Sequence, residues 1–112
     1  MAYTPKIIPA TQLTATVAVY YTASANSKAT KITALSVTNT TGTNRSFTAY
    51  LVPAGGSPTA ANQVSPGVTV PAGSVYLPWE IIGQMLPPGG TLQCLSDASS
   101  ALTLSGAVVE AS

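Results

Sequence analysis

The sequence contains no histidine, one cysteine and only seven charged side chains among its 112 residues. An average soluble domain of this length carries roughly 28 charged residues, about a quarter of the chain. Zinc, haem and iron–sulfur sites need clusters of cysteine, histidine or carboxylate ligands, and a serine-protease type of triad needs a histidine. We therefore expect a protein that has no catalytic residues, no metal and no cofactor.

Clustered positive charge and long apolar runs are also missing. Four lysine and arginine residues are offset by three acids, whereas nucleic-acid binding rests on clustered cations. The longest apolar candidate, residues 13–21, is interrupted by threonine and falls short of the roughly 20 residues that cross a bilayer. The first residues lack the basic-then-apolar order of a signal peptide, and the lone Cys94 fits a reducing cytoplasm. Neither nucleic acid nor a membrane is expected as a partner.

Hydrophobic residues are abundant in spite of this low charge. They make up 46% of the chain, and its mean hydropathy is positive, which excludes the composition of a disordered protein. The chain must bury a core, yet it has few charges to keep its outer surface apart from other surfaces. Neutral, partly apolar surfaces mark protein interfaces. We expect other protein to cover part of this surface.

The turn-forming residues predict an all-β protein. Nine glycines, nine prolines and many β-branched residues favour short strands and turns over helices. The pattern predicts a single β-sandwich, jelly-roll or Ig-like, of seven or eight short strands. Strands are expected at 13–21, 31–38, 47–52, 60–70, 75–77, 91–96 and 101–110, with one helical turn over 79–85. The turn at 40–44 predicts a hairpin between the second and third of these strands.

Alternation in two of these segments predicts which side chains face the core. In 13–21, period-2 spacing places five residues on one face: Leu13, Ala15, Val17, Val19 and Tyr21. In 101–110, Leu102, Leu104 and Val108 are expected to point inward. Tyr20 and Tyr21 are adjacent, so they are expected on opposite faces of their strand.

Residues 1–12 differ from the rest and predict an extended N-terminal arm ahead of a sandwich domain at 13–112. Two prolines forbid a regular helix there and cannot donate to a central sheet ladder. Such an arm reaches roughly 30 Å, enough to lie across a neighbouring subunit. Deletion of residues 2–10 is then expected to weaken binding while leaving the domain folded. The candidate contact residues are Tyr3, Pro5, Ile7, Ile8, Pro9 and Trp79.

The aromatic and acidic residues leave two other interpretations open. Trp79 and the tyrosines are able to stack on sugar rings, as in a carbohydrate-binding sandwich, or to pack at the sandwich rim with their polar atoms outward. Glu80 and Asp97 are the acids of the middle of the chain, and their spacing does not support the facing carboxylates of a glycosidase. Solvated or capping roles are expected for both.

Four stretches of strand-and-turn sequence carry a resemblance to a known class of proteins. They are Lys31–Thr40, Ala49–Gly56, Ile82–Leu92 and Leu104–Val108, and together they cover roughly residues 30–110. With these stretches the chain resembles the small β-sandwich virion proteins of tailed bacteriophages, in particular those that decorate or cement the head shell. The motifs carry no chemistry, so no catalytic residue is transferred.

The resemblance implies a jelly-roll or Ig-like sandwich bound to an icosahedral shell. Its function would be to staple neighbouring major capsid protein subunits and so stabilise the head. The implied partners are the major capsid protein and neighbouring copies of this chain, in homo-oligomeric contacts. The implied location is the virion head surface, after assembly in the bacterial host cytoplasm. A neck, tail or fibre protein of the virion is the first alternative, and a carbohydrate-binding module is the second.

Overall fold

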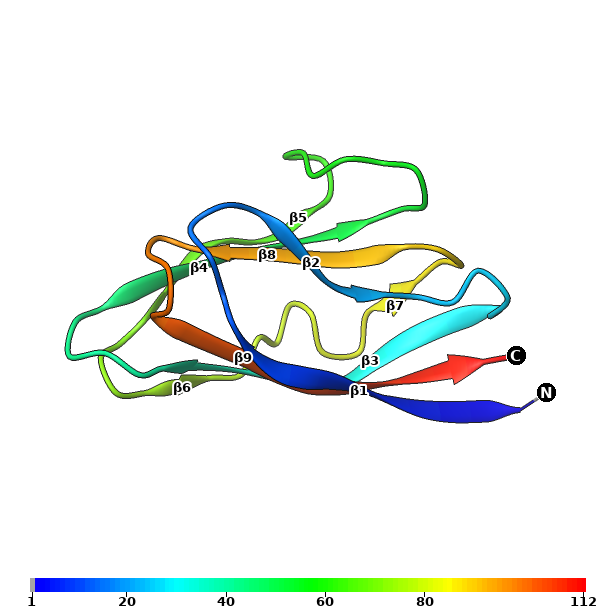
Figure 1. Cartoon of the computed structure of the whole chain (residues 1–112). Coiled ribbons are helices and arrows are strands. Elements are labelled where there is room, and N and C mark those ends of the chain that lie inside the picture. Colours follow the sequence, from blue (N-terminus) through cyan, green and yellow to red (C-terminus); the bar gives the residue numbers. More distant parts are fainter. Residues whose placement is uncertain (1) are drawn as a thin grey trace.

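A computed structural model describes residues 2–112 and shows two packed layers of antiparallel strands (Figure 1). Nine strands are present in this part of the chain, two of them only two residues long, and it contains no helix. The structure confirms the all-β sandwich that the turn-rich, β-branched sequence predicts. Met1 of the expected arm lies outside the described residues.

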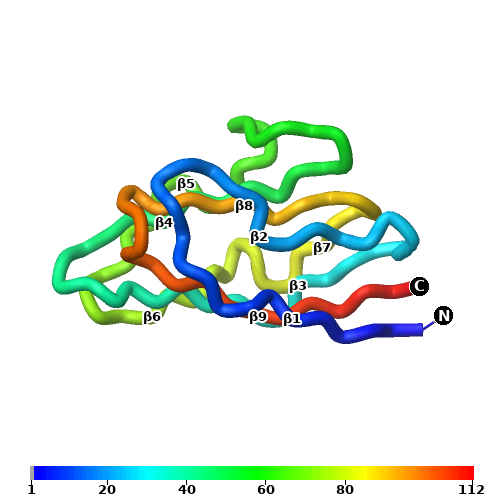
Figure 2. The backbone as a smooth tube through the Cα atoms, viewed as in Figure 1, coloured from blue at the N-terminus to red at the C-terminus, as the bar shows by residue number. Residues whose placement is uncertain are grey.

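The first layer, called sheet I, has five strands. Its order is β1 (Tyr3–Gln12), β9 (Leu102–Ala111), β3 (Ala29–Asn39) and β6 (Val75–Tyr76), and β7 (Met85–Leu86) also pairs with β3. The long strands β9 and β3 form its centre. The chain begins and ends side by side in this sheet, with Tyr3 opposite Ala111 (Figure 2).

The second layer, called sheet II, has four strands. Its order is β2 (Ala18–Thr22), β8 (Thr91–Ser96), β4 (Arg45–Val52) and β5 (Gln63–Val70). Alternation is regular along β8, where Leu92 and Cys94 point inward and are fully buried. The strand expected at 91–96 is therefore confirmed at its full length.

The core lies between the two sheets. Its largest fully buried side chains come from both sheets and from their connections: Phe47, Ile8, Leu13, Ile32, Ile81, Leu86, Leu92, Leu102 and Leu104. The inward positions predicted on the last strand are confirmed, because Leu102, Leu104 and Val108 are fully buried. The segment between β6 and β7 folds toward the space between the layers (Figure 1) and contributes Ile81. The helical turn expected over 79–85 is present as a single turn, in which the N–H groups of Ile81 and Ile82 both bond to the Pro78 carbonyl, and it ends before β7.

The expected hairpin at 40–44 is wrong. β3 belongs to sheet I and β4 to sheet II, so the turn between them crosses from one layer to the other. Asn39 makes this crossing possible, because its buried amide Nδ2 donates to the carbonyls of Thr43 at 2.8 Å and Val70 at 2.9 Å. A side chain thus satisfies two backbone carbonyls at the point where the chain changes layer.

The strand expected at 13–21 is also shorter than its alternation suggests. Residues 13–17 cross from sheet I to sheet II, and β2 begins only at Ala18. Leu13 is buried, but Ala15, Val17 and Val19 of the same expected face are exposed. A register shift between Val19 and Tyr21 breaks the period, and Tyr20 and Tyr21 both pack against the core.

The structure differs from the expectation of an arm separate from the sandwich. Residues 3–12 are extended, as predicted, but they form the edge strand β1, paired with β9 over most of its length. The Leu13 N–H continues this contact with a bond to the Leu102 carbonyl, so no boundary lies between residues 12 and 13. Ile8 is only 1% exposed and belongs to the core. Deletion of residues 2–10 would therefore remove part of the domain.

Candidate functional site

The face of sheet I that points away from the core is lined mostly by small, uncharged side chains. Along β9 the residues alternate, and the outward ones are Thr103, Ser105, Ala107, Val109 and Ala111. The adjacent strand β3 presents Ala34 and Ser36 beside them. No element within residues 2–112 forms a third layer over this face.

Large apolar side chains stand at both margins of this face. On one margin, β1 places Tyr3 opposite Ala111 and Ile7 opposite Ala107, with 68% and 77% of these side chains exposed. On the other margin stand Leu77 and Met85, which are 47% and 56% exposed. We call the whole surface the outer trough, with the outward residues of β9 and β3 as its floor and Tyr3, Ile7, Leu77 and Met85 as its rims.

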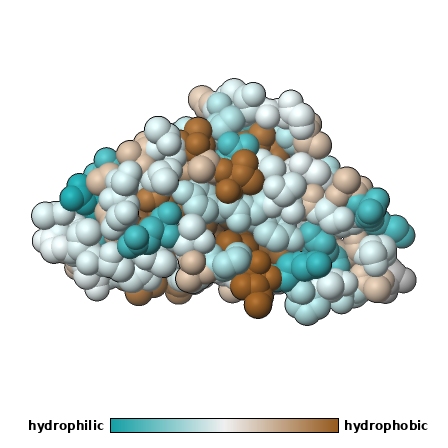
Figure 3. Space-filling view, in the orientation of Figure 1, coloured by the Kyte–Doolittle hydropathy of each residue, from teal (hydrophilic) through white to brown (hydrophobic). Residues whose placement is uncertain are grey.

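Figure 3 shows the sandwich from the side. Hydrophobic residues appear in brown over the middle of β1, at the lower margin of the view, and over β2 in the upper layer. The lower group lies where β1 borders the outer trough. Exposed apolar side chains that gather in this way are typical of surfaces that contact other molecules.

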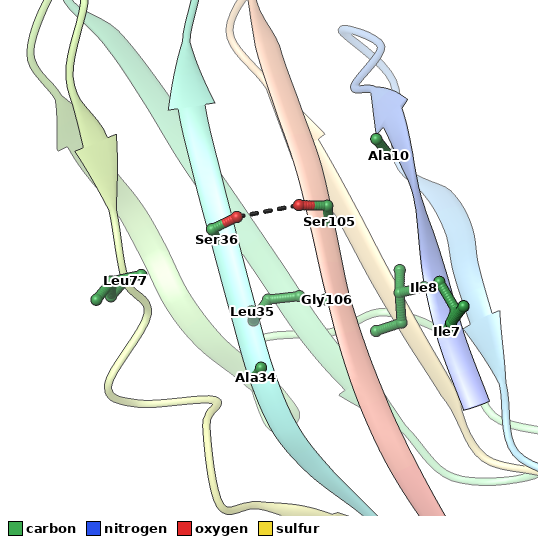
Figure 4. Close-up of a pocket in the computed structure, with 9 residues that line it drawn as sticks. All are labelled: Ile7, Ile8, Ala10, Ala34, Leu35, Ser36, Leu77, Ser105 and Gly106. Atoms are coloured by element: carbon green, nitrogen blue, oxygen red, sulfur yellow. Dashed lines mark hydrogen bonds between the residues drawn. The ribbon is translucent and has the colours of Figure 1, made fainter. Parts of the chain in front are cut away.

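One open hollow of about 420 Å³ occupies one end of the outer trough (Figure 4). Ile7 and Leu77 stand on opposite sides of it, and Ser36, Ser105 and Gly106 lie between them. The hydroxyls of Ser36 and Ser105 are 3.1 Å apart and hydrogen-bond to each other across the two central strands. These polar atoms are thus satisfied within the floor, which leaves a mostly apolar surface for a partner.

The floor of this hollow depends on Gly106. A β-carbon at this position would overlap the carbonyl oxygen of Ala34 and lie 2.9 Å from Cδ1 of Leu35. The close approach coincides with a register shift in β3 between Ile32 and Ala34. Glycine in a strand interior commonly marks such a close approach of backbones.

A second hollow of about 270 Å³ lies at the other end of the outer trough. It is bounded by Tyr3 and Met85, and its floor is formed by Ala29, Lys31, Thr33, Val109 and Ala111. Lys31 and Met85 are cross-strand neighbours and therefore point to the same face. Among the residues that line the two hollows, Lys31 is the one charged side chain.

The free edge of β1 does not offer a regular ladder to another strand. The Ala2 carbonyl accepts a bond from Ser112 N–H at 2.8 Å. In this part of β1 the backbone N–H and carbonyl groups of the even-numbered residues therefore point toward β9, and those of the odd-numbered residues point toward the free edge. Pro5 is odd-numbered, so its backbone nitrogen, which carries no hydrogen, faces the free edge and costs the sheet no hydrogen bond. Pro9 lies at the register shift between Ile8 and Thr11, another place where sheets tolerate proline. The two prolines explain how this segment joins the sheet and also protect its edge from strand addition.

A buried carboxylate joins the two layers near one end. Tyr21 of β2 donates its hydroxyl to Oε2 of Glu110 on β9 at 2.5 Å, and the Ser24 N–H donates to the same oxygen at 3.0 Å. The hydrogen bond from Tyr21 is the main cause that holds the pKa of Glu110 below its ordinary value of 4.5. Burial, together with the adjacent carboxylate, raises the pKa of Tyr21 well above its usual range.

A second carboxylate fixes the segment that carries Leu77. Glu80 accepts bonds from the hydroxyls of Tyr76 on β6 and Ser65 on β5, each at 2.7 Å. Burial acts to raise the pKa of Glu80, but the bonds from Tyr76 and Ser65 hold it below its ordinary value. Burial and the bond to Glu80 raise the pKa of Tyr76 to about 12. Glu80 is thus a structural link between the layers, whereas the sequence predicted a solvated or capping role.

The structure brings together three of the six contact residues chosen from the sequence. Tyr3, Pro5 and Ile7 lie at successive alternate positions of β1, at the rim of the outer trough. Ile8 is a correction, because its side chain points into the core. Pro9 is exposed at the register shift. Trp79 is 79% exposed in the turn after β6, and it is not among the described residues that line either hollow.

Sequence reasoning missed the opposite rim and the floor. Leu77 and Met85 belong to short segments whose position beside β3 depends on long-range pairing. The floor had a detectable signal in the strand expected at 101–110. Leu102, Leu104 and Val108 point inward, whereas the outward positions hold no residue larger than valine, namely Thr103, Ser105, Ala107, Val109 and Ala111.

Residues 2–112 contain no group of three or more Cys, Asp or Glu side chains placed to hold a metal ion. No helix of sufficient length and apolarity to span a membrane occurs in that range. Cys94 is a free thiol buried in the core, and burial raises its pKa.

The chain was compared with known proteins by sequence and by structure. It matches no family model and no curated protein sequence. Among solved structures it is similar to a chain from the structure of infectious bursal disease virus, Gx strain, with a TM-score of 0.57 and 16% identity over 99% of this chain. It is also similar to a chain from the crystal structure of the T13 particle of the same virus, with a TM-score of 0.56 and 10% identity over 97% of this chain.

These similarities concern the fold. This chain spans about a third of each matched chain, 33% and 31% respectively. Within that third, almost every residue of this chain has a structural counterpart. Its sandwich is therefore arranged like a sandwich found in chains of an icosahedral virus particle.

Proposed function

We propose that this chain is a non-enzymatic structural protein of a bacteriophage virion that decorates the head and staples neighbouring major capsid protein subunits. The outer trough would be its docking surface. The observation that carries the proposal is this trough, a charge-poor face with apolar rims on a sandwich that resembles, over 99% of its length, part of a virus-particle chain. The resemblance of residues 30–110 to phage head proteins supports the finer assignment.

The size of the face suits a stable contact. The molecule measures 45 × 25 × 19 Å along its principal axes, and a specific interface buries about 800 Å² on each partner. At about 25 cal/mol per Å², the apolar part of such an interface contributes several kcal/mol before association costs are subtracted. A copy that touches two capsid subunits gains further from the high effective concentration at its second contact.

The acidic residues support a structural role. Glu110 and Glu80 are both engaged by tyrosine hydroxyls between the layers. Asp97 lies 4.0 Å from Arg45 in a loose surface ion pair. Each acid thus has a partner within the domain, and none is paired across an open cleft in the way hydrolysis of a glycosidic bond requires.

The proposal is tested by the number of copies in a purified particle that carries this protein. Quantitative mass spectrometry against the major capsid protein, together with an electron-microscopy map, gives both copy number and position. Head decoration predicts copies in a fixed ratio to the capsid subunits, with density on the outer shell. A single ring of copies at the neck or tail, or absence from the particle, would refute head decoration.

A further inference from the structure

The outer trough has a shape that selects the kind of partner segment able to fill it. In one row of cross-strand neighbours, Pro5, Val109, Lys31 and Met85 lie side by side on four adjacent strands. With strands about 4.8 Å apart, the two margins of the trough are roughly 14 Å apart. An α-helix with its side chains is about 10–12 Å wide. The trough thus has the width of one helix.

The length of the trough also fits a short helix. The floor on β9 from Ser105 to Ala111 covers both hollows. At about 3.3 Å per residue this stretch is roughly 20 Å long, which corresponds to about 13 helical residues.

The backbone chemistry excludes an extended occupant. The backbone groups of β9 and β3 are already engaged inside sheet I, so a strand lying on this face would find no partners for its own N–H and carbonyl groups. Adding a strand beside β1 is hindered by Pro5. A helix forms its backbone hydrogen bonds internally and presents only side chains to the floor.

The rims exclude a flat occupant. Two sheets that pack face to face lie about 10 Å apart, so a second sheet would need close contact across its whole width. Tyr3 and Ile7 on one margin and Leu77 and Met85 on the other project beyond a floor of small side chains, so they would hold a flat sheet away from it. This argument also disfavours a second copy of this chain docked face to face, which would in addition bring two Lys31 ammonium groups to the same face.

Charge then defines one further feature of the partner. Lys31 is the one charged residue among those lining the hollows, and the salt bridge described for this chain involves Arg45 instead. An ammonium group that becomes covered by a partner needs an opposite charge, because an unpaired buried charge is strongly unfavourable.

We propose that the outer trough binds an amphipathic α-helix of a neighbouring subunit, about 13 residues long, with an apolar stripe and one carboxylate that pairs with Lys31. The inference rests on the proposed function only for the identity of that subunit. The helix itself is defined by the trough, so its test needs no virus particle.

The test uses the full-length protein and a set of labelled peptides of about 14 residues. The first peptide is an Ala-rich helix with a Leu stripe and one Glu within the stripe. A second has the same composition with the Leu residues spread around the helix, a third has a central proline, and a fourth has Lys in place of Glu. Fluorescence anisotropy measures binding, and amide chemical shifts of the protein show where each peptide binds.

The expected result is binding of the first peptide, with shift changes confined to β1, β9, β3 and the 77–85 segment. The second and third peptides should bind at least about tenfold more weakly. Lys31→Glu should weaken the Glu peptide at least about tenfold and favour the Lys peptide, because a covered charge pair loses that much when it is reversed. Thr69→Arg, on the outward side of sheet II, should leave binding unchanged.

The inference would be overturned by any of the following results. One is equal binding of the striped and the proline-containing peptides. Another is binding that leaves the amide signals of the outer trough unmoved, or no binding of any peptide. The last is concentration-dependent dimerisation of the protein through the trough, which would identify a second copy as its occupant. A particle lacking the protein would refute the proposed function alone, because peptide binding is measured without particles.

Discussion

The hydroxyl of Tyr21 lies 2.5 Å from Oε2 of Glu110 and so connects β2 of sheet II to β9 of sheet I. Of the three acids in this chain, one is thus used to hold the two layers together beside the chain termini. Glu80 makes a similar link near the other margin of sheet I, because it accepts bonds from Tyr76 of sheet I and from Ser65 of sheet II. In a protein with seven charged residues, two carboxylates serve the interior of the fold.

Removal of the Tyr21 hydroxyl should destabilise the protein. Tyr21→Phe leaves the buried carboxylate of Glu110 with the Ser24 N–H but without its shortest donor. Bonds to charged groups contribute about 1.5–3 kcal/mol, so the free energy of unfolding in urea should fall by about that amount. Tyr50→Phe is the control, because the Tyr50 hydroxyl only accepts a bond from Gln63, and it should cost less than about 1 kcal/mol. Equal effects of the two substitutions would contradict the role of Glu110.

Acid should destabilise the fold through the same two carboxylates. The pKa values of Glu80 and Glu110 are lower in the folded state than their ordinary value of 4.5. As the pH falls, the unfolded chain therefore takes up protons first, so the stability contributed by both groups is present above pH 4.5 and is lost as the pH falls through their folded pKa values.

This pH dependence is measured by urea unfolding between neutral pH and pH values well below 4.5. The midpoint should decrease on acidification in the natural sequence. In the double variant Glu80→Gln with Glu110→Gln, stability at neutral pH should be lower and its loss in acid smaller. A variant that loses stability in acid as steeply as the natural sequence would show that other groups are responsible.

The Gly106 position should tolerate no side chain. Gly106→Ala would push a methyl group against the Ala34 carbonyl and the Leu35 side chain in the centre of sheet I. Overpacking of this kind costs about 1–3 kcal/mol, which thermal or urea unfolding will detect. Gly42→Ala is a matched control, since a β-carbon there has no neighbour within 4 Å. It should leave stability unchanged or raise it slightly; destabilisation by Gly42→Ala to the same extent would contradict the steric explanation.

Two adjacent isoleucines should behave in opposite ways. Ile8 is 1% exposed and Ile7 is 77% exposed, although both lie on β1. Ile8→Ala should lower the free energy of unfolding by about 2–5 kcal/mol, because it leaves a cavity in the core. Ile7→Ala should change stability by less than about 0.5 kcal/mol, as surface substitutions usually do. Similar costs at the two positions would show that β1 is not docked in the register described.

Occupancy of particles should depend on the outer trough. Ala34→Arg adds a large charged side chain to an exposed position that lines the hollow between Ile7 and Leu77. On capsid shells that lack the natural protein, this variant should reach an occupancy at least about tenfold lower than the natural protein does, because a buried unpaired charge opposes docking. Thr69→Arg adds the same charge on the outward side of sheet II and should bind like the natural protein. If both variants bound equally well, the trough would not be the docking surface.

Several features of the fold followed from the sequence because they depend on local chemistry. Strand and turn content, the inward positions of Leu102, Leu104 and Val108, and the strand at 91–96 all arise from alternation and from turn-forming residues. Tyr3, Pro5 and Ile7 were chosen as candidate contacts because two prolines and aperiodic apolar residues stand out in a short segment; their contact role stays a prediction.

Other predictions were wrong because local alternation of residues does not show where the chain changes layer or register. The turn at 40–44 has the composition of a hairpin, but the buried amide of Asn39 bonds to Val70 on a distant strand and directs the chain into the other sheet. Tyr20 and Tyr21 both face the core because of a register shift in β2 that a period of two does not contain.

What the sequence determined by itself is the class of the protein: an all-β sandwich, poor in ionisable groups, with a core to bury. Composition and periodicity suffice for this, because burial and turn formation act on each short segment separately. The tertiary structure alone decided that residues 3–12 complete sheet I and that Leu77 and Met85 face Tyr3 and Ile7 across one surface. Those relations join residues more than 60 positions apart, and only the pairing of whole strands brings such residues together.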